Sequence, residues 1–135
     1  MRLKMLKLFY AIEIGAYLAY KGHYEASGNV EIRRISKEEL KHMILLKNIL
    51  DMYGETPNII LNVIFLVIGY NIRLLCKIIP KFLLNRVAES LEVINVINYE
   101  YAAKQFPIFK DTFIEMQENE KEHEMYFKSL RFDAS

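Results

Sequence analysis

The sequence predicts an all-α protein, a four-helix bundle made of two similar helical hairpins. The composition supports long helices over many short strands, since 53% of the 135 residues are hydrophobic and only 5 are glycine and 3 proline. Apolar residues also recur in steps of three and four along four segments, as they do on one face of a helix. Finally, the second half of the chain repeats the first. A chain of this length is expected to form a single domain, residues 1–135.

The first hairpin is expected over about residues 3–53, with its turn at residues 26–29. The stripe of its first helix is Leu3, Leu6, Tyr10, Glu13, Tyr17, Tyr20 and Tyr24. The stripe of its second helix is Ile32, Ile35, Glu39, His42, Leu46, Ile49 and Tyr53. Only Glu13, Glu39 and His42 interrupt the apolar and aromatic character of these stripes, so all three are expected to face the core.

The second hairpin is expected over about residues 87–130, with its turn at Pro107, which lacks the N–H that a helix interior needs. Its first stripe is Glu92, Val96, Tyr99, Ala103 and Phe106. Its second stripe is Phe109, Phe113, Met116, Glu120, His123, Phe127 and Leu130. Three charged or titratable residues again lie on stripes that are otherwise apolar.

The two hairpins repeat one another in sequence. The matched segments are AIEIGAYLAY (11–20) with SLEVINVINY (90–99), and EELKH (38–42) with NEKEH (119–123). This alignment superposes Glu13 on Glu92 and Tyr20 on Tyr99. In each hairpin the lone Glu and the Glu of the Glu-x-x-His pair lie about equally far from the turn. The lone Glu, the Tyr seven residues after it, and the Glu and His of the pair are therefore expected at the same level of each hairpin.

Residues 54–86 join the hairpins and are unusually apolar, above all between residues 59 and 72. The apolar run is shorter than the roughly 20 residues of a membrane-spanning helix. Its basic residues follow the run: Arg73, Lys77, Lys81 and Arg86. A long apolar crossover, expected to be helical, fits this segment.

The Glu-x-x-His pairs carry the chemical prediction. Residues at i and i+3 of a helix lie close enough to ligate one ion. Two such pairs plus a lone Glu from each of two other helices form the dimetal carboxylate site of ferritin-like bundles. Oxygen-rich ligands with a few imidazoles favour iron, with manganese as the alternative. The predicted ligands of two metal ions are Glu13, Glu39, His42, Glu92, Glu120 and His123.

Each signal has a plainer alternative. A lone Glu-x-x-His is more often part of a solvated surface, and Ser36 to Glu39 also matches a Ser-x-x-Glu capping box at a helix start. Tyr20 and Tyr99 are expected to be core residues whose hydroxyls reach the ligands or their neighbours, with a redox role as the alternative. Glu89 is either an alternative ligand or a solvated residue near a helix start. No catalytic residue is predicted beyond the metal ligands.

Several segments resemble a known family. They are EIGAYLAYKGHY, EELKH, the IGY of residues 68–70, and VAESLEVINVINYEYAAKQ. From about Leu6 to Leu130 the chain resembles the ferritin-like di-iron superfamily, and within it the demethoxyubiquinone hydroxylases of ubiquinone biosynthesis. The spacings from Glu13 to Glu39 and from Glu92 to Glu120 are short for that family.

The resemblance implies a di-iron, dioxygen-activating monooxygenase that acts on a lipophilic, quinone-like substrate at the membrane surface. Iron handling or peroxide reduction, as in ferritins and rubrerythrins, is the alternative, and a helical binding module without metal is a third. The implied partners are the lipophilic substrate, dioxygen, an external electron donor, the membrane surface and a second copy of the chain as a homodimer. The expected location is cytoplasmic, peripheral on the inner face of the membrane.

Charge and cysteine content exclude other classes. The net charge is +1 and the longest basic run is Arg33-Arg34, so nucleic acid is not an expected partner. The single Cys76 precludes an intramolecular disulfide and a Cys-x-x-Cys metal site, and suits a reducing compartment. Glu13 interrupts the apolar N-terminal stretch, which is therefore expected to be a helix and not a signal peptide.

Overall fold

The structure, a computed structural model, describes residues 2–130 and confirms the predicted all-α class over that part of the chain. Its elements are α1 (Arg2–Ser27), α2 (Val30–Met52), α3 (Ile59–Leu75), α4 (Lys81–Gln105), a short 3-10 helix η1 (Pro107–Phe109) and α5 (Lys110–Ser129). The chain packs as two compact units that divide after Ile78. Unit 1 holds α1 to α3, and unit 2 holds α4, η1 and α5.

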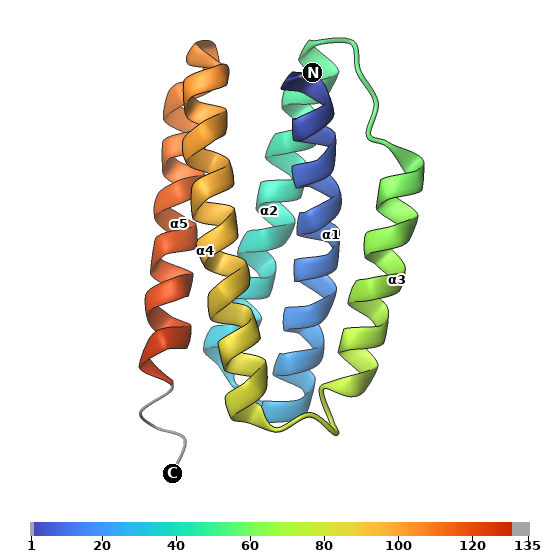
Figure 1. Cartoon of the computed structure of the whole chain (residues 1–135), viewed down its shortest axis with the longest axis vertical. Helices are drawn as coiled ribbons and strands as arrows, with labels where there is room; N and C mark the ends of the chain where they lie inside the picture. The colour runs from blue at the N-terminus through green and yellow to red at the C-terminus, as the bar shows by residue number, and fades with distance from the viewer. Residues whose placement is uncertain (1, 131–135) are drawn as a thin grey trace. The chain divides into compact units, whose positions relative to one another are not determined.

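In unit 1, α2 and α3 both pack against α1 (Figure 1). Gly28 has a φ of 69°, a left-handed conformation that glycine adopts without strain, and it turns the chain between α1 and α2. Asn29 then caps α2, because its side-chain oxygen accepts hydrogen bonds from the backbone N–H groups of Glu31 at 2.9 Å and Ile32 at 3.4 Å. Gly54, with a φ of 70°, follows the end of α2.

Helix α3 lies very close to α1, and glycines make this approach possible. A Cβ atom added at Gly22 of α1 would lie 2.5 Å from the Cα of Arg73 in α3. One added at Gly69 of α3 would lie 2.9 Å from the Cα of Gly15. At these two places backbone meets backbone, and no larger residue fits without a shift of one helix. The packing explains why α3 is held beside α1 although most of its apolar side chains are exposed.

In unit 2, α5 packs along α4. Helix α4 ends at Gln105, just before Pro107, which begins η1 instead of continuing the helix. Tyr99 and Phe113 hold the two helices together near this turn, with ring centroids 6.4 Å apart and nearly parallel planes. The turn is thus where the sequence predicted it.

The segment expected as a crossover, residues 54–86, differs in one respect from its prediction. Residues 59–75 form the helix α3, but residues 81–86 belong to α4. Pro80 supplies the reason, since proline is unsuited to a helix interior yet compatible with a helix start. Residue 1 and residues 131–135 of the predicted single domain lie outside the described residues. None of the described helices combines the length and apolar character needed to cross a membrane.

The predicted core stripes are largely buried. Every predicted stripe position of α2 from Ile32 to Ile49 is buried, and so is every one from Phe113 to Phe127 in α5. The stripe of α1 is less uniform, because Tyr10, Tyr17 and Tyr24 are only partly buried. In α4 one predicted stripe position is wrong. Val96 is only partly buried, and the neighbouring Asn95 is buried in its place.

Candidate metal centre

Unit 1 gathers three metal-ligating side chains in its interior. Glu13 comes from α1, and Glu39 and His42 come from successive turns of α2. Nδ1 of His42 lies 3.5 Å from Oε2 of Glu39 and 3.9 Å from Oε2 of Glu13. One ligand atom from each of the three residues lies within 4.8 Å of the others. We call this set the first cluster.

The structure also decides between the two interpretations of Glu39. Helix α2 begins at Val30 and its cap is Asn29, so Glu39 lies in the helix interior. Ser36 does not cap a helix; its hydroxyl donates a hydrogen bond to the backbone carbonyl of Tyr17, at 3.2 Å. The capping-box alternative is wrong, because the periodic residues before Ser36 extend the helix by nearly two turns. Glu39 is therefore a core residue.

Unit 2 repeats the arrangement. Glu92 comes from α4, and Glu120 and His123 come from successive turns of α5. Nδ1 of His123 lies 3.5 Å from Oε2 of Glu92 and 3.9 Å from Oε1 of Glu120. One ligand atom from each again lies within 4.8 Å of the others. We call this set the second cluster.

The chemistry of the donor set fits a bound cation. All six side chains of the two clusters are at most 1% exposed. Each cluster contains two carboxylates and one imidazole, and burying a carboxylate charge is costly unless a cation accompanies it. Two ligand atoms each about 2.1 Å from one ion lie roughly 3.0 to 3.4 Å apart, near the shorter imidazole–carboxylate separations of 3.5 Å. The buried Glu and His clusters can therefore hold metal ions.

Asn95 contacts the second cluster, and the sequence pattern did not predict this. Its side-chain amide, 2% exposed, donates a hydrogen bond to Oε2 of Glu120 at 3.1 Å. The signal was present, because Asn95 follows Glu92 by three residues and shares its face of α4. In the repeat alignment the position equivalent to Asn95 is Ala16, which cannot donate from its side chain. The two halves therefore differ at this position beside their predicted ligands.

Other polar and titratable residues lie outside the two clusters. Tyr20 and Tyr99 are buried, at 2% and 1% exposure; their proposed hydroxyl role stays a prediction. Glu89 is buried in α4 but is not among the described residues grouped as metal ligands. His23 is likewise buried and belongs to neither cluster. Glu118 and Glu122, which lie off the α5 stripe, are exposed.

No protein-family model, curated protein or solved structure matches the chain. The chemistry of the two clusters is consequently the main guide to function.

Proposed function

We propose that the protein is a non-haem di-iron monooxygenase, similar to the demethoxyubiquinone hydroxylases, that hydroxylates a lipophilic quinone-like substrate. The observation that carries the proposal is the pair of buried clusters, each with two carboxylates and one imidazole. Their sequence repeat supports a common role in one ferritin-like site with two ions. Residues 54–80, which precede α4, would then be the crossover of that fold, and manganese is the alternative to iron.

Charge supports two divalent ions. Four carboxylates and two neutral imidazoles carry a formal charge of minus four, which two divalent cations neutralise. Glu13, Glu39 and His42 would be the ligands that unit 1 supplies, and Glu92, Glu120 and His123 those that unit 2 supplies. Asn95 orients Glu120 by fixing its Oε2 atom. When bound, a ferrous pair supplies the chemistry that activates dioxygen, and an external donor provides the two electrons that monooxygenation requires.

The surface of α3 supports a lipophilic substrate and a membrane location. Its exposed apolar residues include Ile59, Ile60, Val63, Val67, Tyr70 and Leu74. A helix that leaves this much apolar side chain in water is suited to lie in a lipid headgroup region, where Lys77 can reach anionic lipid. Rubrerythrin-like peroxide reduction or ferritin-like iron handling would use the same six ligands, but neither needs such a surface.

Iron binding tests the proposal most directly. Purified protein loaded anaerobically with ferrous iron should hold about two iron ions per chain by elemental analysis. Glu92→Gln removes one buried ligand charge and should lower both iron content and the gain in thermal stability that iron confers. Glu122→Gln, an exposed residue of α5, is the matched control and should bind iron as the natural chain does. Less than about half an iron per chain would rule out every di-iron function.

Activity then separates the candidates. The hydroxylase should convert a short-chain demethoxyquinone to its hydroxylated product when a reductant and dioxygen are supplied, with one oxygen atom from dioxygen in the product. A protein that binds two irons but consumes hydrogen peroxide without hydroxylating the quinone would support the rubrerythrin-like alternative.

A further inference from the structure

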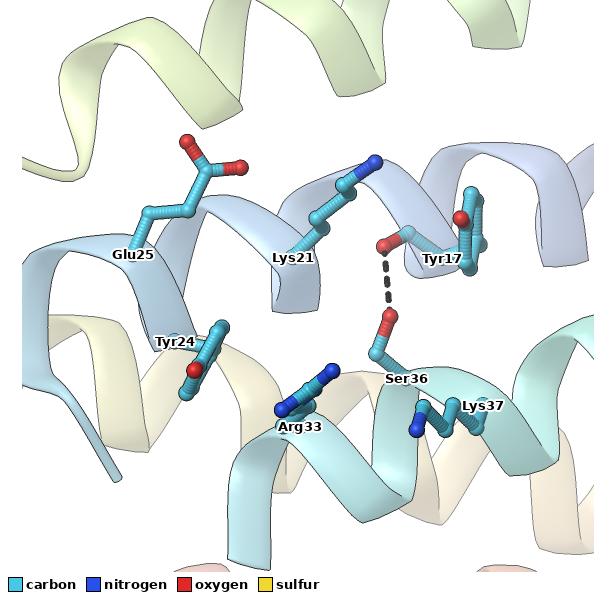
Figure 2. A pocket seen from close by; sticks show the side chains of 7 residues that line it. All are labelled: Tyr17, Lys21, Tyr24, Glu25, Arg33, Ser36 and Lys37. Atoms are coloured by element: carbon cyan, nitrogen blue, oxygen red, sulfur yellow. Dashed lines mark hydrogen bonds between the residues drawn. The ribbon is translucent and has the colours of Figure 1, made fainter. Parts of the chain in front are cut away.

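A pocket of about 330 Å³ opens between α1 and α2, within unit 1 (Figure 2). Its lining residues are Tyr17, Lys21, Tyr24, Glu25, Arg33, Ser36 and Lys37. None of these residues belongs to the first cluster. The volume lies at the lower end of the roughly 300 to 1,000 Å³ typical of small-molecule sites.

The pocket has a marked excess of positive charge. Lys21, Arg33 and Lys37 face a single carboxylate, that of Glu25. Figure 2 shows the carboxylate of Glu25 turned toward α3, where its Oε1 pairs with Arg73 at 2.7 Å. Glu25 is thus engaged with Arg73, and its carboxylate pairs with none of the three cations that line the pocket.

The three cations that line this pocket have no carboxylate partner of their own among the described residues. Between residues 2 and 130, no carboxylate forms an ion pair with Lys21, Arg33 or Lys37. Arg34, the next residue after Arg33, is paired with both Glu31 and Glu38. Farther along α2, Lys47 pairs with Asp51. Three neighbouring cations without an acid repel one another unless an anion joins them.

Aromatic rings hold two of the cations in place. The ammonium of Lys21 lies 5.8 Å from the centre of the Tyr17 ring, and the guanidinium of Arg33 lies 5.5 Å from that of Tyr24. A cation–π contact engages the charge of the guanidinium and leaves its N–H donors available to an acceptor. Ser36 also ties the two walls together through its hydrogen bond to the carbonyl of Tyr17. The hydrogen bond of Ser36 therefore joins the two helices that line the pocket, and the N–H groups of Arg33 remain available to a ligand.

We propose that this pocket binds a phosphoryl group. A phosphate dianion offers several terminal oxygens and a charge that suits a pocket lined by three basic side chains, whereas a carboxylate is satisfied by one bidentate arginine. The Tyr17 and Tyr24 rings and the pocket volume leave room for the rest of a small phosphorylated molecule. The phosphodiester headgroup of an anionic phospholipid also offers phosphate oxygens, with one negative charge, and is the second possible source of the ligand.

Inorganic phosphate is the first probe. Titrated into isotope-labelled protein in a low-salt buffer free of other polyvalent anions, it should produce saturable shifts of the backbone amide signals of Lys21, Arg33 and Lys37. The double change Arg33→Gln with Lys37→Gln should weaken binding about tenfold, since each cation lost removes one charge-assisted contact on a partly solvated surface. Arg34→Gln is the control: it alters the same kind of side chain next door and should leave the affinity unchanged.

Vesicles of phosphatidylglycerol, compared with neutral phosphatidylcholine vesicles, distinguish the lipid source. If free phosphate gives no saturable shifts, selective binding to phosphatidylglycerol that falls in the Arg33 and Lys37 double variant but not in Arg34→Gln would assign the site to a lipid headgroup. Saturable phosphate shifts would assign it to soluble ligands. The proposal is overturned if neither probe binds, or if Arg34→Gln weakens binding as much as the double change does. Circular dichroism establishes that each variant is folded.

Discussion

Nδ1 of His123 lies nearer to Glu92, at 3.5 Å, than to Glu120 of its own helix, at 3.9 Å. The first cluster has the opposite order: His42 is nearer to Glu39 of its own helix than to Glu13. The hydrogen bond from Asn95 to Glu120 accompanies this difference and has no counterpart at Ala16. The two clusters thus have the same residue types but differ in which carboxylate lies nearer to the histidine.

Asn95→Ala should therefore impair the second cluster without removing a ligand. The change deletes a buried hydrogen-bond donor and should lower the free energy of unfolding by about 1 to 3 kcal/mol, measured by urea denaturation. It should also speed loss of iron to a chelator, because Glu120 is less well held. Asn98→Ala, on the same helix and partly exposed, is the control. Equal effects of the two changes would contradict a supporting role for Asn95.

The close approach of α1 and α3 predicts opposite outcomes at two glycines. Gly22→Ala places a Cβ 2.5 Å from the Cα of Arg73, so α3 must shift, and the unfolding free energy should fall by about 1 to 3 kcal/mol. Gly15→Ala meets nothing nearer than 3.4 Å and should be neutral or up to about 1 kcal/mol stabilising, as alanine favours the helix. Thermal and urea unfolding would measure both. Equal destabilisation by the two changes would refute the packing argument.

The outer surface of α3 predicts binding to lipid. Ile60→Glu combined with Val67→Glu charges two residues that are 69% and 54% exposed, and should lower vesicle partitioning at least about tenfold. Flotation with liposomes measures this. Ile108→Glu alters an apolar residue that is 81% exposed in unit 2 and serves as the control. If the control loses as much partitioning as the α3 variant, α3 is not the membrane-facing surface.

Cys76 should react slowly with thiol reagents. Burial raises the pKa of the Cys76 thiol, and the negative charge of Glu25 raises it further. Since only the thiolate is nucleophilic, alkylation by iodoacetamide at about pH 8 should be much slower in the folded protein than in urea. The rate should climb only as the pH rises above the usual thiol range. Mass spectrometry follows the modification, and rapid labelling of the folded protein would show that Cys76 is not protected.

Periodicity was sufficient to predict the four helices of the two hairpins and the burial of the six Glu and His residues of the two clusters. Stripes of apolar residues in steps of three and four located Glu39 and His42 in a helix interior, and the structure buries both. The same method placed Val96 where Asn95 belongs, because it followed apolar residues and passed over a neighbouring amide. A polar residue such as Asn95 does not contribute to an apolar stripe. Its contact with Glu120 therefore could not be predicted from the apolar pattern.

The close packing of α3 against α1 could not be predicted from the sequence, for a different reason. Glycines at positions 22 and 69 have no side chain to enter a hydrophobic pattern, yet they determine how near α3 comes to α1. The start of α4 at Lys81 was missed because Pro80 was taken as part of the apolar segment and not as a helix start. Both features depend on backbone sterics, which a pattern of apolar residues does not describe.

The contact between Gly69 and Gly15 links the position of α3 to the position of the α1 turn near Glu13. Gly15 is two residues from Glu13, so the turn of α1 that bears a predicted ligand rests directly on the backbone of α3. A larger residue at Gly69 would act as a wedge that displaces this turn, and with it the carboxylate, from a distance. The position of a predicted ligand can thus be adjusted by substitutions on a helix that contributes none. Such substitutions would vary the chemistry of the protein while its six predicted ligands stay the same.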